Sequence, residues 1–288
     1  MSKITEEKIK KILPKNGPPL KEVSKYIEKY KNELIVIKYG GNVFIDRNIF
    51  NNFIEDISLL NKLGLSIVVV HGGGPRIKRE LDKSNIHSKF IRGLRVTDKK
   101  IIDIVESVLI DFNNDIVSSL DKIGSKAISI NTKSNNIIKV IPESEDLGFV
   151  GIPNKINVDI IKDIINENII PIISPLGLGT NNQSYNINGD TAAGAIAKSL
   201  KSRRLLLMTN VKGVLDKEKN LIEEISSSEI LDMIKNGTIT EGMIPKINTC
   251  LDSINNGVTA VGIIDGREKH SILFEIFSDK GSGTLIRK

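Results

Sequence analysis

The sequence of 288 residues has no tryptophan, few aromatic residues (4%) and a single cysteine, Cys250. With one cysteine, no disulfide can form within the chain. This excludes a small disulfide-stabilised secreted domain and suits a reducing compartment. Cys250 shares one face of a predicted helix with Ile247, Leu251 and Ile254. The spacing indicates that Cys250 is a core residue rather than a nucleophile.

Long hydrophobic runs are also missing. No segment is long enough to cross a bilayer, and the N-terminus lacks the apolar core of a signal peptide. Glu6, Glu7 and Glu22 make the N-terminus too acidic for a transit peptide. We therefore expect a cytoplasmic protein without membrane association. The plastid stroma is the alternative if the gene is encoded in an organelle.

The net charge is +6, but no basic run is interleaved with aromatic residues. Because the lysines are scattered among acidic residues, we expect no nucleic-acid partner. A modest excess of lysine fits anionic ligands better. The two commonest nucleotide motifs are absent, since neither G-x-x-x-x-G-K-[ST] nor G-x-G-x-x-G occurs.

What the sequence does contain is a strand that runs into a glycine-rich turn, at Ser66–Pro75. The β-branched run Ile67–Val70 predicts a strand buried on both faces, as in a parallel sheet. Three glycines and Pro75 then lead into a helical pattern. Exposed backbone N–H groups and the helix dipole suit an anion at such a turn. A tight turn without a ligand would leave the same pattern.

Strand and helix patterns alternate along most of the chain. Strands are predicted at 34–37, 66–70, 169–174, 205–208, 258–264 and 284–286. Helices are predicted at 48–63, 77–83, 158–166, 191–200, 228–235 and 244–255, with a longer one after Thr97 or Asp98 as N-cap. Ala127–Ile130 and Ile137–Ile141 predict a β-hairpin. We expect an α/β fold with a mostly parallel central sheet flanked by helices.

The chain divides into an N-terminal helical arm (1–32), an N-terminal lobe (33–173) and a C-terminal lobe (174–288). The arm has two helical patterns, separated by Asn16-Gly17-Pro18-Pro19. It packs either on the chain's own core or on another subunit, and the sequence leaves both alternatives open.

Glycine-containing segments follow four predicted strands. Ligands of an open α/β sheet bind outside the carboxyl ends of its strands. The four segments are Lys38–Gly41, His71–Gly74, Pro175–Gly179 and Thr209–Gly213. Lys38 ends an apolar strand, where it either extends to water or points into the crevice. His71 is a structural residue more often than a catalytic one in such a position.

Lys246 carries a positive charge at the beginning of a predicted helix, where the helix dipole disfavours cations. It follows Pro245, which is suited to the first helical turn, so its charge opposes the helix dipole. Such a violation is typical of a functional site, and a bound phosphate would relieve it. Asp190 begins a helix, where it is either an N-cap or a carboxylate that orients cations. Arg95 could bind a substrate carboxylate in a forked geometry.

Together these stretches resemble the amino acid kinase family, from about Leu34 to Ile286. The matching motifs are Ile37–Gly41, Val70–Pro75, Gly93–Asp98, Asp146–Gly151, Tyr185–Ala192 and Gly242–Lys246. The motifs Gly93–Asp98 and Tyr185–Asp190 resemble family members whose acceptor is N-acetyl-L-glutamate.

The resemblance implies transfer of the ATP γ-phosphoryl group to the side-chain carboxylate of N-acetyl-L-glutamate. Mg²⁺ would bridge the ATP phosphates, with no permanently bound metal. By position, Lys38 and Lys246 match the lysines that stabilise the transferred phosphoryl group, and Asp190 matches the acid that holds both. The residues that match the acceptor site are Gly73, Gly74, Arg95, Asn186 and Asn188.

The resemblance also places the nucleotide. The matching residues are Gly40, Gly41, Asn210, Val211, Lys212, Gly213, Val214 and Leu215. Asn210 stands where the family usually has Asp.

Regulation is the third implication of the resemblance. In arginine-inhibited members, an N-terminal helix swaps between dimers to build a hexamer, and L-arginine binds beside it. The residues that match this allosteric site are Tyr26, Lys217, His270, Glu275 and Gly283. We expect a hexamer inhibited by L-arginine. The resemblance leaves open whether a PII-type signal protein binds.

Two other functions stay open. The chain could phosphorylate another carboxylate or carbamate, such as glutamate or acetylaminoadipate. It could also be a catalytically silent domain that senses arginine, because the same fold serves as a regulatory domain. The presence of Lys38, Asp190 and Lys246 together argues against the second alternative.

Overall fold

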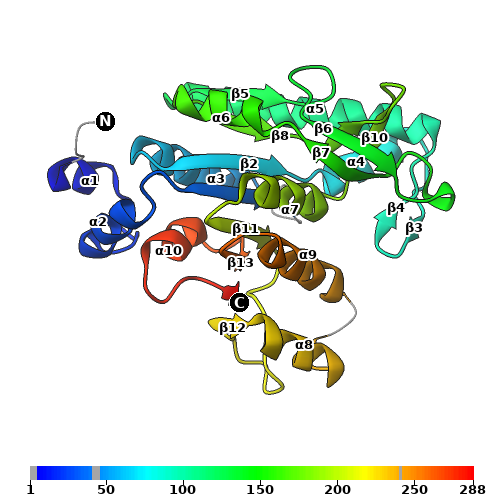
Figure 1. The fold of residues 1–288 in the computed structure, drawn as a ribbon. Helices are drawn as coiled ribbons and strands as arrows, with labels where there is room; N and C mark the ends of the chain where they lie inside the picture. Colours follow the sequence, from blue (N-terminus) through cyan, green and yellow to red (C-terminus); the bar gives the residue numbers. More distant parts are fainter. Residues whose placement is uncertain (1–4, 41–45, 240–241) are drawn as a thin grey trace.

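A computed structural model describes residues 5–40, 46–239 and 242–288 (Figure 1). Its main sheet has eight strands in the order β12-β14-β13-β11-β1-β2-β8-β5. In chain order their bounds are β1 (Leu34–Tyr39), β2 (Ser66–His71), β5 (Ala127–Ile130), β8 (Ile170–Ile173), β11 (Arg204–Thr209), β12 (Glu224–Ser226), β13 (Ala260–Asp265) and β14 (Thr284–Arg287). Only the β13–β14 pair is antiparallel among these neighbours. The predicted α/β fold with a mostly parallel sheet is confirmed.

Helices cover both faces of this sheet (Figure 1). One face carries α1 (Glu6–Ile12), α2 (Leu20–Lys29), α3 (Arg47–Lys62), α5 (Lys99–Lys122) and α10 (Ser271–Phe277). The other carries α6 (Val158–Asn166), α7 (Gly189–Leu200), α8 (Ser227–Lys235) and α9 (Ile244–Asn255). Because side chains alternate along a strand, Ile35 and Ile37 of β1 pack on the first face and Val36 packs on the second.

A second sheet of four strands lies beside the main one, in the order β10-β9-β6-β7. Its strands are β6 (Ile138–Pro142), β7 (Gly151–Ile156), β9 (Leu176–Leu178) and β10 (Ser184–Asn186), and a short helix, η2 (Glu145–Leu147), precedes β7. The predicted hairpin of 127–130 with 137–141 is therefore wrong. β5 pairs with β8 in the main sheet, and β6 pairs with β7 and β9.

The turn between β5 and β6 explains that error. The side chain of Asn131 accepts the N–H groups of Lys133 and Ser134, and Asn135 has a positive φ of 55°. Such an Asx turn closes locally, as a hairpin turn does, but here it carries the chain from one sheet into the other.

Two further elements lie next to the glycine-rich turn. Helix α4 (Gly74–Lys83) begins at the last glycine, with Pro75 in its first turn, and packs on α5. Strands β3 (Phe90–Ile91) and β4 (Leu94–Arg95) form a two-stranded ribbon that the sequence patterns missed. They also missed β9, β10, β12 and α10.

The N-terminal arm packs on the chain's own core. Val23, Tyr26 and Tyr30 are buried in the same cluster as Ile272 and Phe277 of α10. This is the first of the two alternatives for the arm. The division into two lobes near residue 174 stays a prediction, and β1 pairs directly with β11 across it.

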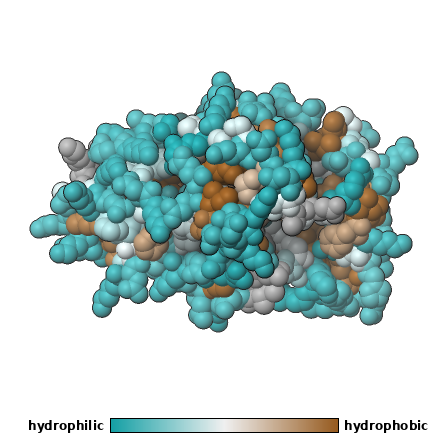
Figure 2. Space-filling model, turned by 90° about the horizontal axis from the view of Figure 1, so that it is seen from below, coloured by the Kyte–Doolittle hydropathy of each residue, from teal (hydrophilic) through white to brown (hydrophobic). Residues whose placement is uncertain are grey.

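The described face in Figure 2 is mostly hydrophilic, with scattered hydrophobic residues between the polar ones. Within residues 5–40, 46–239 and 242–288, no helix has the length and apolar character needed to cross a membrane.

Candidate active site

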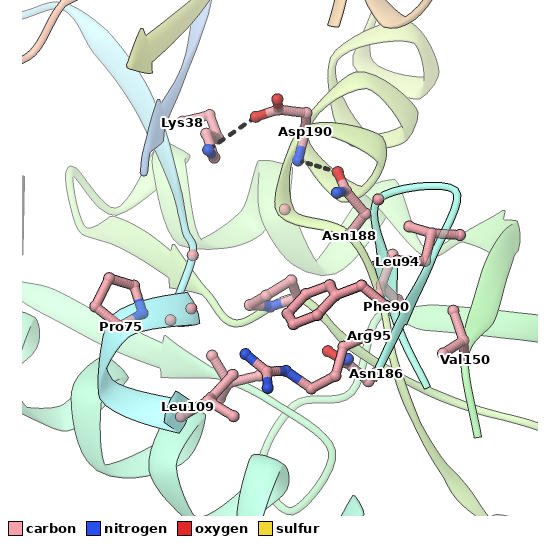
Figure 3. A pocket seen from close by; sticks show the side chains of 18 residues that line it. Lys38, Pro75, Phe90, Leu94, Arg95, Leu109, Val150, Asn186, Asn188 and Asp190 are labelled. Carbon is pink, nitrogen blue, oxygen red and sulfur yellow. Dashed lines mark hydrogen bonds and ion pairs between the residues drawn. The ribbon is translucent and has the colours of Figure 1, made fainter. Parts of the chain in front are cut away.

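Two lysines meet at one carboxylate beside the carboxyl ends of the central strands. Lys38 of β1 lies 2.8 Å from Oδ1 of Asp190, at the start of α7 (Figure 3). Lys246, in the first turn of α9, donates a hydrogen bond to Oδ2 of the same carboxylate. All three side chains are largely buried, with 10–18% of each exposed. The sequence placed these residues apart, and the fold brings them together.

The three charges determine the protonation of Asp190. Burial raises the pKa of its carboxyl group, but the charges of Lys38 and Lys246 and the hydrogen bonds they donate outweigh burial and hold that pKa well below its usual range. Asp190 is therefore ionised at neutral pH. The cluster keeps one net positive charge and Arg95 adds another at the cavity, which favours an anionic ligand.

Asp190 is not the N-cap of α7, contrary to one of its two predicted roles. The cap is Asn188, whose Oδ1 accepts the N–H groups of Asp190 (2.9 Å) and Thr191 (3.1 Å). The cap satisfies the backbone of the helix end, which frees the Asp190 carboxylate for the lysines.

Glycines on two elements make room for the Lys38 side chain. A Cβ atom on Gly40 would lie 1.7 Å from Lys38 Nζ, and one on Gly189 would lie 3.2 Å from Lys38 Cε. A side chain at position 40 would therefore displace the end of Lys38, and one at position 189 would crowd it. Gly41, the other predicted residue of this turn, lies outside the described residues.

A cavity of about 250 Å³ opens next to Lys38 and Asp190 (Figure 3). It brings together every residue predicted for the acceptor site: Gly73, Gly74, Arg95, Asn186 and Asn188. Its apolar lining includes Phe90, Leu94, Leu109 and Val150. The cavity therefore combines cations, amides and glycine backbone with an apolar wall.

The polar side chains of the cavity are held by their neighbours. The guanidinium of Arg95 lies 4.8 Å from the centre of the Phe90 ring and donates a hydrogen bond to the hydroxyl of Ser88. Asn186 Nδ2 donates to Thr97 Oγ1 at 3.4 Å. Asn186 Oδ1 is thereby oriented as an acceptor.

Sequence reasoning missed the apolar wall. Phe90 and Leu94 sit in strands of two residues, too short to show a period, although both flank Arg95 in a segment that the motifs had singled out. Leu109 has the pattern of an ordinary core residue of α5. Nothing in the sequence distinguishes it from its neighbours.

The predicted nucleotide segment follows β11 and is separate from this cavity. Gly213 has a φ of +151°, and the N–H of Val214 donates to Thr284 Oγ1 at 2.8 Å. Asn210, Val211, Lys212 and Leu215 are exposed. Asp265, at the end of the adjacent β13, forms an ion pair with Arg267 at 2.6 Å. The sequence patterns did not identify this ion pair, which lies at the end of β13, the neighbour of β11 in the sheet.

The residues predicted for arginine binding lie in two groups. Tyr26 donates to Asp279 Oδ1 at 2.7 Å, and Glu275 accepts the N–H of Ser282 at 3.0 Å, just before Gly283. His270 instead faces α3, where its Nδ1 lies 2.6 Å from Asp56 Oδ1.

Lys217 is exposed on the loop between β11 and β12. It is therefore the one predicted arginine-site residue that lies outside both groups.

The described residues offer no cluster of three or more His, Cys, Asp or Glu side chains for a metal. Asp190 does not fit a metal either, because a lysine occupies each of its oxygens.

A sequence profile described as the amino acid kinase family matches residues 33–265. The chain belongs to the amino acid kinase family. Within it, acetylglutamate kinase of Pelagibacter ubique (strain HTCC1062) is 55% identical over 288 residues, which is 100% of both chains. These matches confirm the predicted family and the prediction that the chain is a phosphotransferase.

The fold is also similar to those of solved structures. N-acetylglutamate synthase from Neisseria gonorrhoeae, complexed with coenzyme A and N-acetyl-glutamate, has a TM-score of 0.84 at 22% identity and matches 93% of this chain and 62% of its own. The same synthase complexed with coenzyme A and L-arginine has a TM-score of 0.81 at 21% identity and matches 93% and 64%. At these identities the likeness concerns the amino acid kinase fold alone.

Proposed function

We propose that this chain transfers the γ-phosphoryl group of ATP to the side-chain carboxylate of N-acetyl-L-glutamate, giving N-acetyl-L-glutamyl 5-phosphate and ADP in the second step of L-arginine biosynthesis. The observation that carries the proposal is the Lys38–Asp190–Lys246 cluster at the edge of a cavity lined by Arg95 and Asn186. The 55% identity to an acetylglutamate kinase over the whole chain supports the choice of acceptor.

In the proposed reaction the cavity holds the acceptor. Arg95 binds the α-carboxylate, since its fork of donors matches two carboxylate oxygens. Asn186, whose Nδ2 is held by Thr97, accepts the amide N–H of the acetamido group. The N–H groups of Gly73 and Gly74 bind the side-chain carboxylate at the end of the cavity nearest Lys38.

The lysines supply the electrostatics of the transfer. Phosphoryl transfer spreads negative charge over the oxygens of the moving group, and fixed cations stabilise that charge without a covalent intermediate. Lys38 binds from the acceptor side and Lys246 from the opposite side. Asp190 keeps both ammonium groups in place while the site is empty. The positions of acceptor and donor supply the rest of the rate increase.

ATP binds on the other side of the lysines, against residues 210–215 and Gly40. Mg²⁺ enters with the nucleotide, and its chemistry is to neutralise the phosphates. No step above requires a metal held by protein side chains.

The proposal is tested by an ADP-coupled assay on a substrate panel. We expect activity with N-acetyl-L-glutamate and at most slight activity with L-glutamate, because the free ammonium group would have to be buried in a cavity that already holds Lys38 and Arg95. Activity on free glutamate or acetylaminoadipate, but not on N-acetyl-L-glutamate, would reject the choice of acceptor.

For regulation, we propose a cytoplasmic hexamer inhibited by L-arginine, with Tyr26, His270, Glu275 and Gly283 near the inhibitor. The support is their position around α10 and the segment 279–283, where the arm meets the rest of the chain. Lys217 and a PII-type partner belong to the same proposal. Arginine titration of the full chain, with its mass measured in solution, tests the proposal; an arginine-insensitive enzyme would reject it.

A further inference from the structure

His71 makes one hydrogen bond, and that bond fixes its tautomer. The ring is fully buried at the end of β2, edge-on to Phe112 with the ring centres 5.0 Å apart. Its Nδ1 lies 2.9 Å from the carbonyl oxygen of Gly72. Because a carbonyl oxygen can only accept, Nδ1 must carry the proton. Nε2 is then a bare acceptor, and it has no hydrogen-bond partner among the described residues.

The bond acts on a single peptide unit. The carbonyl of Gly72 and the N–H of Gly73 belong to the same peptide, which is planar and trans like the other described peptide bonds. Carbonyl and N–H therefore point in opposite directions. A hydrogen bond that holds the carbonyl toward the His71 ring also turns the Gly73 N–H away from it.

The alternation of side chains shows where that N–H is directed. His71 lies on the face of the sheet that packs on α3 and α5, with Val69 of its own strand. Lys38 lies on the other face, with Val36, toward α7 and α9. Turned away from His71, the Gly73 N–H faces the side of the sheet that holds Lys38 and Asp190.

Contacts around Gly72 further restrict the orientation of the Gly72–Gly73 peptide. The Gly72 N–H donates to the Tyr39 carbonyl at 2.8 Å, so the peptide before it is also fixed. A Cβ atom on Gly189 would lie 3.6 Å from Gly72 Cα, which places the beginning of α7 against the same residue. Within the described part of the chain, the Gly73 N–H has no backbone acceptor. Gly73 itself lines the cavity.

We propose that His71 is a positioning residue that aims the Gly73 N–H into the cavity, at the carboxylate of the acceptor. The inference rests on the proposed function for the identity of that carboxylate. Glycine lets the backbone approach the ligand but does not fix its own orientation, and His71 supplies the missing constraint. A preorganised donor needs no reorientation when charge develops in the transition state.

Three substitutions separate this role from simple packing. His71→Asn places an amide donor near the position of Nδ1, His71→Gln places it near Nε2, and His71→Leu fills the space without a donor. We expect kcat/KM for N-acetyl-L-glutamate to stay within about threefold of wild type in the Asn variant and to fall roughly 10- to 100-fold in the other two. The KM for ATP should not change. A Leu variant as active as the Asn variant would overturn the proposal.

A measurement on the wild-type chain keeps the proposal testable if the variants fold poorly. The chain has three histidines, so ¹⁵N spectra of histidine-labelled protein can be resolved, and the His71 signals are assigned by elimination with His87→Gln and His270→Gln. We expect the Nδ1–H tautomer for His71; an Nε2–H tautomer would overturn the proposal. If wild type fails to phosphorylate N-acetyl-L-glutamate, the proposed function is rejected, but the tautomer still decides whether His71 holds Gly72.

Discussion

Lys38 and Lys246 bind different oxygens of the Asp190 carboxylate, although they come from β1 and α9, which lie about 200 residues apart in the chain. Asp190 lies between them, and its negative charge offsets the repulsion between the two ammonium groups. The spacing suits a group that carries negative charge on several oxygens at once, as a transferred phosphoryl does.

Removing one lysine should affect the chemistry rather than the fold. For Lys246→Met we expect kcat to fall roughly 10²- to 10³-fold with a small change in the KM of the acceptor, because the lost charge matters most in the transition state. The matched control is Lys198→Met. Lys198 forms an exposed ion pair with Asp252 at 2.6 Å and also joins α7 to α9. Equal losses in the two variants would mean that only the helix contact matters.

Gly40→Ala should displace Lys38 from its partner. The new methyl carbon would lie 1.7 Å from Lys38 Nζ, closer than any real contact, and the flexible end of the lysine must move. We expect at least a tenfold loss of kcat and little change in the free energy of unfolding, since only a side-chain end is displaced. Steady-state kinetics and thermal unfolding measure the two quantities. An active Gly40→Ala enzyme would show that the path of Lys38 is not required.

His71 makes stability depend on pH. Burial and, to a smaller extent, the nearby charge of Arg76 lower its pKa to about 4, against the opposing effect of the bond to Gly72. An unfolded histidine titrates near pH 6.5, so the unfolded chain binds a proton between these values and the folded chain does not. The stability linked to His71 is therefore complete above pH 6.5 and decreases by about 3 kcal/mol as the pH falls to 4.

His71→Asn should remove that part of the pH dependence. Urea unfolding of wild type and variant at pH 7 and pH 4.5 measures it, and the difference between the two proteins cancels the titration of other groups. Parallel curves for the two proteins would contradict a buried, neutral His71.

The Tyr26–Asp279 hydrogen bond should couple the arm to arginine sensitivity. Tyr26→Phe removes the 2.7 Å bond and keeps the ring in the core, so we expect a loss of about 1 kcal/mol in stability and a several-fold rise in the arginine concentration for half inhibition. Lys25→Met is the control, because Lys25 pairs with the same carboxylate at the exposed surface. Equal arginine sensitivity in wild type and Tyr26→Phe would separate the arm from regulation.

Much of the fold followed from local patterns in the sequence. The buried β-branched runs of β1, β2 and β8 and the 3.6-residue period of α5 depend on burial alone, which the order of residues records. The hairpin prediction failed because the turn at 131–136 looks the same whether its strands pair with each other or with distant ones. That choice is made by β8, about forty residues further along.

The active-site residues likewise include some that local patterns identify, whereas their meeting depends on distant pairings. Lys246 was recognisable because its charge opposes its own helix, and Asp190 because it opens one. That both meet Lys38 depends on pairings between β1 and β11 and between α7 and α9, which no local pattern contains. Asn188 was predicted to bind the substrate. Its role as the N-cap of α7 was not predicted, because it depends on the helix beginning at Gly189.

The most direct test of the proposed function is to trap its product. An acyl phosphate reacts with hydroxylamine to give a hydroxamate, whereas the product of simple ATP hydrolysis does not. With ATP, Mg²⁺, N-acetyl-L-glutamate and hydroxylamine, wild type should form hydroxamate and ADP in equal amounts, and Lys246→Met should form little of either. ADP without hydroxamate, or neither product from wild type, would contradict the proposed transfer.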